Sequence, residues 1–370
     1  MSCPDAYEAL AALETLCAPF SEVAWEAAMH KSAFIGFVLT LVARNILPTV
    51  PAFVFTSPIA GAGKSLLVES AAMIVFGHKP GLRPYPDKGD EMRKVLHAAM
   101  LAGDPLVVFD NLYNGAAIGD AALNAYLTGE VMADRTLGVS ESPRTVNLSC
   151  FAFTGVNISA RADSVRRFLA VSIDPNCEHP EQRAFTIEDL VDHCRENRPT
   201  LLHAALTILR AFIFANAPRI AEREPLGSYV VWDRLIAGCL AWLNLPDPVE
   251  TQRELADVDL DAGNTVAVLT QLEREFGRKS FTFPDIRSKC EMGPLAEIVS
   301  TVCGGNQDKN INRFALWLRA HEGQVRGGMK LVREGLTHGR ARYQIVRLES
   351  STSVSQDLSE TPATSMSDDY

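Results

Sequence analysis

The apolar residues of this chain follow three successive patterns along its length. Residues 1–48 show helical periodicity in EALAALETL and WEAAMHKSAFIGFVLTLVARNIL, and Pro48 and Pro51 end that stretch. Between residues 52 and 176, short apolar runs alternate with helical stretches, which predicts a parallel sheet with crossover helices. Residues 186–245 are again mostly helical. The expected strands are AFVFT (52–56), LVVFD (106–110), LSCFAFTG (148–155) and FLAVSID (168–174).

The C-terminal part of the chain has a different order of elements. Residues 247–263 are acidic and polar, as in a linker or an exposed helix, and four helical stretches then precede two short strands. These strands, MKLVREG and ARYQIVRLE, flank LTHGR and predict a hairpin, which gives the order of a winged helix. The last residues are rich in Ser, Thr and Asp and are expected to be disordered. The expected domains are a helical segment (1–48), an α/β core (49–180), a helical subdomain with linker (181–263), a winged-helix-like domain (264–348) and the tail (349–370).

A glycine-rich loop follows the first expected strand. FTSPIAGAGKSLL (55–67) nearly matches the phosphate-binding loop GxxxxGK(S/T), with Pro58 at the position of the first glycine. In such a loop, backbone N–H groups and a helix N-terminus bind phosphates, Lys64 reaches the β- and γ-phosphates, and the Ser65 hydroxyl holds Mg²⁺. The alternative is a turn without a ligand, but the order of strand, loop and helix favours a P-loop. The expected nucleotide-binding residues are Gly61, Ala62, Gly63, Lys64, Ser65 and Leu66, and the expected cofactors are ATP and Mg²⁺.

An acidic residue ends the second apolar run of the expected sheet. In LVVFDN, Asp110 stands at the C-terminal end of a buried strand, where a carboxylate can orient Mg²⁺ through water. Many ATPases place a general base directly after this residue, but Asn111 cannot accept a proton. Glu91, at the start of the helix MRKVLHAAMLAG, is the best candidate to polarise the attacking water. The alternative for Glu91 is a residue favoured there by the helix dipole.

Two further groups extend the predicted catalytic set. Asn157 follows the strand LSCFAFTG and would lie between the first two motifs, where it could position the attacking water or contact the γ-phosphate. The alternative is an Asn that serves only a turn. Arg166 and Arg167 precede the strand FLAVSID. They are either a surface pair or a source of the arginine that a neighbouring subunit supplies in phosphoryl transfer.

Charge and cysteine content narrow the functional classes. The chain of 370 residues is 47% hydrophobic and carries a net charge of −10. Residues 276–348 hold 13 Lys and Arg against 6 Asp and Glu, a net charge of +7, so the rest carries −17 and nucleic acid would contact this basic module.

The most apolar run, residues 33–43, is too short to span a bilayer, so no membrane partner is expected. The eight cysteines form no CxxC pair, which favours reduced thiols in the cytoplasm. Four residues could surround zinc, but their spacing matches no standard zinc finger: Cys177, His179, His193 and Cys194.

The order of these motifs resembles a known ATPase family. GAGKS, DN, TGVN, RR and EHPEQRAF together are similar to the ATPase module of primase–helicase proteins of prophages and other mobile elements, relatives of superfamily 3 helicases in the AAA+ class. DRTLGVS (134–140) and two later stretches (226–248 and 314–335) are also similar, so the resemblance extends to about residue 348. Val156 departs from the family, which often has Asn there, as Pro58 departs in the loop. The resemblance implies an α/β P-loop NTPase fold, AAA+-like, with flanking helices.

The resemblance also implies a hexameric ring with shared ATP sites. Lys64, Ser65, Asp110 and Asn157 would lie on one face of each interface. Arg166 or Arg167 would then come from the next subunit. The family's usual N-terminal primase domain has no counterpart in this sequence, so priming is not expected, and a separate primase or polymerase is an implied partner.

A DNA-binding hairpin is the last feature that the resemblance implies. Residues 131–150 would form a hairpin that faces the pore, and the SESP turn supports a hairpin independently. Arg135 and Arg144 would contact the phosphates of single-stranded DNA there, while duplex or forked DNA would lie at the winged helix. The segment contains no aromatic residue, so base stacking is not expected.

Three functions fit these features. The first is an ATP-driven DNA helicase or translocase of a phage or mobile element, acting as a ring in DNA replication. The second is a non-processive ATP switch, such as a replication initiator or helicase loader that binds DNA through its winged helix. The third is an ATPase that acts on protein. Strand displacement distinguishes the first from the second, and stimulation of hydrolysis by DNA distinguishes both from the third.

Overall fold

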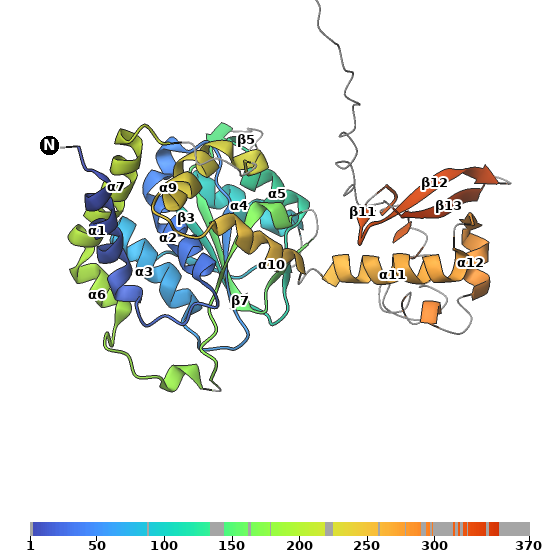
Figure 1. Cartoon of the computed structure of the whole chain (residues 1–370), viewed down its shortest axis with the longest axis horizontal. Helices are drawn as coiled ribbons and strands as arrows, with labels where there is room; N and C mark the ends of the chain where they lie inside the picture. Colours follow the sequence, from blue (N-terminus) through green and yellow to red (C-terminus); the bar gives the residue numbers. More distant parts are fainter. Residues whose placement is uncertain are drawn as a thin grey trace, which may run out of the picture. The chain divides into compact units, whose positions relative to one another are not determined.

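The computed structural model divides into two units, residues 1–261 and 262–370, each of which is described by itself. Figure 1 shows the elements of both units coloured along the sequence. The predicted tail, 349–370, lies outside the described residues. The structure describes residues 3–86, 89–133, 144–161, 164–177, 179–218, 225–257, 260–277, 279–289, 294–296, 298, 314, 317–318, 321–323, 325–337 and 340–347.

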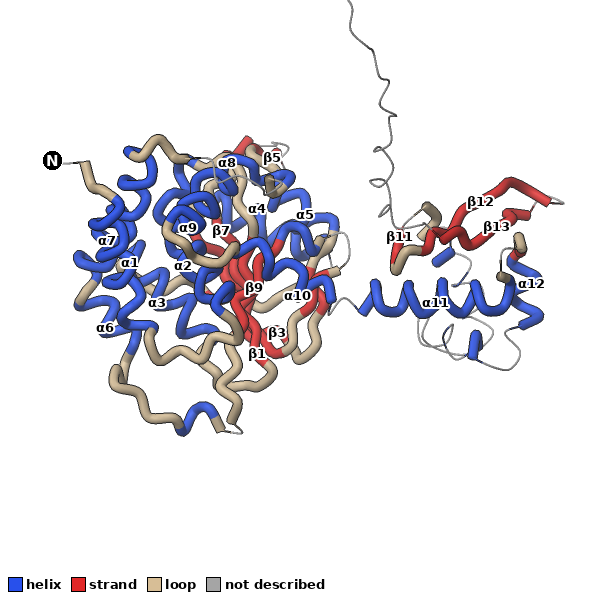
Figure 2. Tube along the Cα trace, in the orientation of Figure 1, coloured by secondary structure: helices blue, strands red, loops and turns tan. Residues whose placement is uncertain are grey.

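Five parallel strands form the central sheet of the first unit (Figure 2). The order across the sheet is β2-β3-β7-β1-β9, so β7 lies between β1 and β3. The fold is therefore a mixed α/β fold with a parallel sheet, as the alternation of strands and helices predicted. In chain order the strands are β1 (Ala52–Ser57), β2 (Leu82–Arg83), β3 (Leu106–Leu112), β7 (Cys150–Val156) and β9 (Phe168–Ser172).

Both faces of this sheet are buried. Along β1, Phe53 and Phe55 pack into the core on one face, while Ala52 and Val54 pack into the core on the other. Successive side chains of a strand point to opposite faces, so a strand covered on both sides is a continuous apolar run. This is why the strands appeared in the sequence as unbroken hydrophobic stretches.

Helices from distant parts of the chain cover the first face. α1 packs against α7, and α2 packs against β9, α3 and α7. The ring of Phe37 on α2 lies 5.0 Å from that of Phe53 and 5.2 Å from that of Phe55. The N-terminal helices therefore share one core with the sheet. The helices on this face are α1 (Ala6–Cys17), α2 (Ala28–Ala43), α3 (Lys64–Phe76), α6 (Leu190–Glu196), α7 (Arg198–Phe214), α8 (Val230–Trp232) and α9 (Gly238–Trp242).

Shorter elements cover the second face and the edge. α4 (Gly89–Leu101) and α5 (Ala121–Thr128) pack into the second core. α10 (Thr251–Asp257) packs against the edge strand β9 and follows η7 (Pro248–Glu250). Two small pairs complete the unit: β4 (Ala117–Ile118) with β8 (Ser159–Ala160), and β5 (Val131–Ala133) with β6 (Arg144–Val146).

The second unit is a helix-and-hairpin module with its own core. The predicted hairpin is confirmed, since β12 pairs antiparallel with β13. Glu273 on α11 accepts two hydrogen bonds from the Arg347 guanidinium, 2.6 and 2.7 Å long, which join the helix to the hairpin. Its sheet has the order β10-β13-β12-β11. The elements are α11 (Leu260–Phe276), β10 (Phe281–Thr282), α12 (Phe283–Lys289), β11 (Val325–Arg326), β12 (Met329–Thr337) and β13 (Arg340–Arg347).

Some elements differ from the expectation. Residues 230–242 lie in the stretch expected to be mostly helical and are helical throughout, but a π-helical segment, Asp233–Ala237, lies between α8 and α9. β10 and β11 were not expected, because strands of two residues are too short to show a period of two. Residues 33–43 lie in the buried helix α2, as expected.

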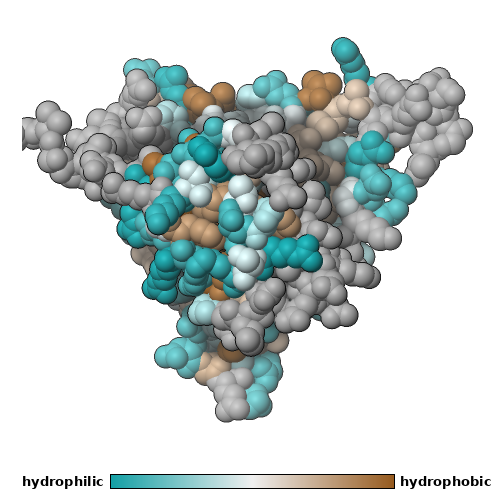
Figure 3. Space-filling model, turned by 90° about the vertical axis from the view of Figure 1, so that its right-hand side faces the viewer, coloured by the Kyte–Doolittle hydropathy of each residue, from teal (hydrophilic) through white to brown (hydrophobic). Residues whose placement is uncertain are grey.

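Among the described helices, none combines the length and the apolar character needed to cross a membrane. On the face in Figure 3, the coloured side chains are mostly hydrophilic, with small apolar patches between them.

Candidate nucleotide-binding site

The glycine-rich loop connects the C-terminal end of β1 to the N-terminus of α3. Gly61 and Gly63 have φ angles of 74° and 91°, a region that suits glycine because it has no Cβ. A Cβ added at Gly63 would meet no atom within 4 Å, so this side of the loop is open to a ligand. Gly63 is the N-cap of α3 and has no side chain to cap the first N–H groups. These donors are therefore available for an anion.

Lys64 lies at the first position of α3 and is 8% exposed. Its ammonium group donates a hydrogen bond of 2.8 Å to the carbonyl oxygen of Ile59, across the loop. Burial lowers the pKa of Lys64, because desolvation disfavours the charged form. A bound phosphate would offset that effect, so the position suits a lysine that meets an anionic ligand.

Ser65 and Asp110 meet directly, although they are far apart in the sequence. The Ser65 hydroxyl donates to Asp110 Oδ1 at 2.6 Å. Thr154 Oγ1, on the intervening strand β7, donates to the same carboxylate oxygen at 2.5 Å. A hydroxyl and a carboxylate are oxygen ligands of the kind that Mg²⁺ takes directly or through water. The three side chains therefore fit a magnesium site beside the loop.

Thr154 is the residue that sequence reasoning missed. It is 1% exposed and, besides donating to Asp110, accepts a hydrogen bond of 3.0 Å from the Asn111 N–H. The signal in the sequence was a single threonine near the end of the apolar strand LSCFAFTG. Only the pairing of β3 with β7 shows that it lies next to Asp110.

Asn111 and Asn157 lie at the C-terminal ends of adjacent strands. Both have positive φ angles, 55° and 49°, and both are exposed. The Asn157 N–H donates to the Ser57 carbonyl at 3.1 Å, and its side-chain amide donates to Asn114 Oδ1 at 3.0 Å. Asn157 therefore lies between the end of β1 and the segment after β3. Contact of Asn157 with a phosphate stays a prediction.

Glu91 lies in the first turn of α4. Its carboxylate forms an exposed ion pair with Lys94 at 2.7 Å, and among the described residues no contact joins Glu91 to Ser65 or Asp110. The structure therefore does not bring Glu91 together with the loop residues, and its role as the base stays a prediction.

Arg166 and Arg167 lie in the short helix η3 (Val165–Arg167), directly before β9. Arg166 is exposed, and its carbonyl accepts a hydrogen bond of 3.1 Å from Gln252 on α10. Phe168, the next residue, pairs with Ala52 at the start of β1, whereas the glycine-rich loop follows the other end of β1. At ~3.3 Å per residue, the two ends of this strand are about 17–20 Å apart.

The two proposed DNA-binding arginines belong to the β5–β6 segment. Arg144 is the first residue of β6 and is exposed. Arg135 lies outside the described residues, as does the turn of the hairpin. The described ends, Val131–Ala133 and Arg144–Val146, pair antiparallel as the predicted hairpin requires.

A cavity of about 470 Å³ opens beside the glycine-rich loop. Its walls come from residues 61–63 and 66–67 of the loop and α3, from Lys79, and from residues within 19–24 before α2, within 173–175 after β9, and within 180–191. The last segment includes most of the run EHPEQRAF. Its size is typical of small-molecule sites, at roughly 300–1,000 Å³. The cavity therefore adds a compartment that the motifs alone did not predict.

Acidic side chains gather on the wall of this cavity. A Cβ at Gly61 would lie 3.1 Å from Glu181 Oε2, so this carboxylate reaches the loop. Glu22 Oε2 accepts from the Thr186 N–H at 2.8 Å, which joins two walls. Arg183 lies over the ring of Phe185, with its guanidinium carbon 5.0 Å from the ring centroid. Carboxylates only accept hydrogen bonds when ionised, so they favour a ligand with amino or hydroxyl donors.

The four residues considered for zinc do not form a metal cluster. Cys177 and His179 are exposed, while Cys194 is buried on α6 and burial raises its pKa to about 12. Among the described residues, the one group of three or more His, Cys, Asp or Glu side chains with ligand atoms close enough for a shared metal ion consists instead of Glu26, His30 and Glu254.

Comparison with known proteins gives distant structural matches only. No protein-family model and no curated protein matches the sequence. Two apo structures of the NrS-1 C-terminal region match with TM-scores of 0.41 and 0.40 and identities of 14% and 13%, over 90% and 92% of this chain and 74% and 75% of theirs. Two structures of JCV helicase match with TM-scores of 0.31 and 0.30 and identities of 11% and 12%, over 70% and 71% of this chain and 63% of theirs. All four TM-scores are below 0.5, so the proposals below rest on the residues of the site.

Proposed function

We propose that this protein is a Mg²⁺-dependent ATPase that acts on DNA as a helicase or translocase. The observation that carries the proposal is the convergence of Ser65, Asp110 and Thr154 beside a glycine-rich loop with a buried lysine. Such a loop holds phosphates with its N–H groups and its lysine, and the hydroxyl and carboxylate hold Mg²⁺. Mg²⁺ would neutralise charge on the phosphates while Lys64 binds their oxygens.

The cavity beside the loop is the proposed place of the adenosine. It begins at Gly61 and Leu66, so a nucleotide whose phosphates lie in the loop would extend its ribose and base into it. The acceptors of Glu22 and Glu181 suit ribose hydroxyls and the adenine amino group, and the exposed ring of Phe185 offers a surface for the base.

A shared site is proposed for Arg166 and Arg167. They lie at the end of the sheet opposite to the loop of their own subunit, too far away for one side chain to reach its own phosphates. An arginine supplied by a neighbour can contribute on the order of 10³-fold or more to phosphoryl transfer. This placement supports a ring in which each ATP lies between two subunits, with a hexamer as the proposed form.

DNA is the proposed macromolecular substrate. The exposed Arg144 on β6 supports phosphate contact by the β5–β6 segment. In the second unit, α11, β10, α12 and the β12–β13 hairpin occur in an order that supports a winged helix, and this part of the chain is basic. The assignment of a replication role to a phage or mobile element follows from the resemblance in sequence.

Two assays test the proposal. The first measures ATP hydrolysis by the wild type, by Lys64→Ala, and by Lys289→Ala, which removes an exposed lysine of the second unit. We expect Lys64→Ala to lose hydrolysis with its fold intact by circular dichroism, and Lys289→Ala to keep it. Wild-type rates in well-folded Lys64→Ala would overturn the nucleotide site.

The second assay measures strand displacement on forked DNA with ATP. We expect the wild type to unwind the fork. We also expect single-stranded DNA to stimulate ATP hydrolysis, and this stimulation to be weaker in Arg144→Ala. Stimulation without unwinding would favour the initiator or loader, and hydrolysis that DNA does not affect would favour an ATPase that acts on protein.

A further inference from the structure

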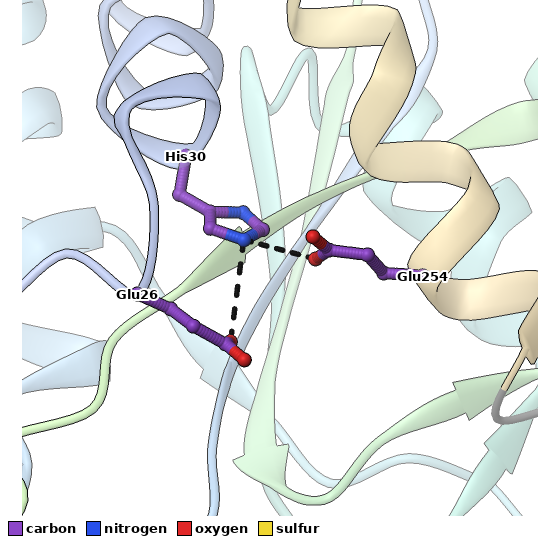
Figure 4. Close-up of side chains that lie close together, drawn as sticks. All are labelled: Glu26, His30 and Glu254. Atoms are coloured by element: carbon purple, nitrogen blue, oxygen red, sulfur yellow. Dashed lines mark ion pairs between the residues drawn. The ribbon is translucent and has the colours of Figure 1, made fainter.

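A second cluster of ligand-type side chains lies at the edge strand of the sheet (Figure 4). Glu26 precedes α2, His30 lies in the first turn of α2, and Glu254 lies on α10. His30 Nε2 is 2.9 Å from Glu254 Oε2 and 4.0 Å from Glu26 Oε2. The imidazole is fully buried, whereas the two glutamates are 54% and 36% exposed. The ring nitrogen thus points from the core toward two carboxylates near the surface.

The two ring nitrogens of His30 have different neighbours, and Nε2 is the one that faces the carboxylates. Nδ1 lies 3.2 Å from the carbonyl oxygen of Ala170, which can only accept. A ring that donates from Nδ1 presents a lone pair at Nε2. This buried nitrogen lies 2.9 Å from Glu254 Oε2, as an ion pair without hydrogen-bond geometry. A cation placed between the nitrogen and the two carboxylates would take a ligand atom from each of the three side chains.

We propose that Glu26, His30 and Glu254 bind a divalent transition-metal ion, with Zn²⁺ as the fitting example. Their ligand atoms all lie within 4.8 Å of one another. Bonds of ~2.0–2.1 Å in a tetrahedral site place ligand atoms about 3.3 Å apart, so small rotations of the two exposed glutamates complete the set. Metal-binding histidines usually donate their other N–H to a carbonyl, as His30 can to Ala170. One imidazole nitrogen with carboxylates suits a transition metal better than Mg²⁺ or Ca²⁺, which prefer oxygen alone.

The chemistry of the three ligand groups supports a cation at this place. Two of them are carboxylates, and the third is an imidazole nitrogen that faces them (Figure 4). The fourth position faces the solvent side, where Glu26 and Glu254 are exposed, and a water molecule would occupy it.

A metal ion at this site would hold the start of α2 and α10 against the edge strand β9. The Glu26 N–H donates to the Ser172 carbonyl at 3.1 Å, and Thr251 Oγ1 on α10 accepts from the Ala170 N–H at 3.0 Å. The metal would therefore join α2 and α10 on top of β9. Because α10 is the last helix that lies wholly within the first unit, a bound ion would stabilise the end of that unit.

The test measures Zn²⁺ binding to the full-length protein, which is first treated with a chelator and then freed of that chelator. Calorimetry and elemental analysis give the stoichiometry for the wild type, Glu26→Gln, His30→Gln and Glu254→Gln. Glu250→Gln serves as the control, because it removes an exposed carboxylate from η7, directly before α10. We expect the control to bind like the wild type, and each ligand variant to bind one equivalent less or at least about tenfold more weakly.

His30 is buried, so His30→Gln could fail to fold, and a second measurement therefore uses the two glutamate variants. Glu26 and Glu254 are partly exposed, so their Gln variants should fold, and circular dichroism verifies this. We expect Zn²⁺ to raise the melting temperature of the wild type and of Glu250→Gln, but not of Glu254→Gln. Equal stoichiometry and equal thermal shifts in wild type and Glu254→Gln would overturn the site, as would the absence of Zn²⁺ binding to the wild type.

Discussion

At the scale of single residues, the candidate site depends on one shared carboxylate oxygen. Asp110 Oδ1 accepts from both Ser65 and Thr154, so two hydroxyls from different elements fix the orientation of this side chain. A carboxylate held in this way is pre-organised for a metal ion, because little conformational freedom is left to lose on binding. Thr154 therefore acts as a positioning residue for Asp110.

Replacing Thr154 by Val tests this arrangement. The change keeps the shape of the side chain but removes the hydrogen bond to Asp110 and the acceptor for the Asn111 N–H. We expect ATP hydrolysis to fall on the order of tenfold and to require more Mg²⁺, since a hydrogen bond to a charged group contributes ~1.5–3 kcal/mol. Steady-state rates across a Mg²⁺ titration measure the effect, with Thr128→Val as a control on α5. An unchanged Mg²⁺ dependence would contradict the role.

Cysteine reactivity is a second property of individual residues. Burial raises the pKa of Cys150, Cys194 and Cys239 to about 12 each, whereas Cys3 and Cys177 are exposed. Only the thiolate reacts, and at pH 8 a thiol of pKa 12 is ionised to about one part in 10⁴. We expect iodoacetamide to label the exposed pair first, and labelling of the buried three to rise with pH. Peptide mass spectrometry measures this; equal labelling of Cys150 in the native protein would be inconsistent with its burial.

At the scale of elements, the segment from η4 (Pro180–Gln182) to the start of α6 forms one wall of the cavity. Arg183 links it to the segment before α2 by donating to the Glu22 carbonyl at 3.3 Å. Phe185 remains 43% exposed in this wall, under the Arg183 guanidinium. An exposed aromatic ring at a cavity beside a phosphate-binding loop is placed to contact a nucleobase.

Phe185→Ala tests that wall. We expect the Kd for ATP to rise about 2–10-fold, because an aromatic contact contributes ~0.5–1.5 kcal/mol, while the Kd for inorganic triphosphate stays the same. Phe214→Ala is the matched control, since this exposed ring also lies near an arginine, with the Arg210 guanidinium 5.8 Å from its centroid. A parallel loss of triphosphate binding in Phe185→Ala would show a general disturbance of the loop instead.

At the scale of the whole molecule, the two ends of the central sheet carry complementary parts of the proposed site. The loop follows the C-terminal end of β1, and the arginine pair precedes β9 at the opposite end. Under the proposal, one subunit would hold both halves without being able to combine them. Assembly would be a condition for hydrolysis, since only a neighbour can bring its arginine to the loop.

A subunit-mixing experiment tests this dependence. Arg166→Ala, Arg167→Ala and Lys64→Ala should each hydrolyse ATP poorly, and both arginine variants should still bind it. Mixing an arginine variant with Lys64→Ala should restore part of the activity, because some interfaces then pair an intact loop with an intact arginine. No recovery despite proven subunit exchange, or full activity in dilute monomer, would argue against a shared site.

The sequence by itself determined the class of fold and the order of the loop motifs. A strand buried on both faces must be apolar throughout, so the strands of the sheet were visible as runs such as AFVF and LVVF. The loop residues around Lys64 and Ser65 are contiguous, and local chemistry was enough to propose them. Two-residue strands such as β10 carry no period and could not be predicted.

Only the tertiary structure decided which distant residues meet. Thr154 joins Asp110 because β7 lies between β1 and β3, and strand order depends on long-range packing that no local pattern encodes. The cavity forms from segments that are far apart in the chain, and the cluster of Glu26, His30 and Glu254 joins residues more than two hundred positions apart. Glu91, which local sequence favoured as the base, pairs with Lys94 on its own helix, and its role as the base stays a prediction. The start of a helix fixes the position of its backbone but not the partner of its side chain.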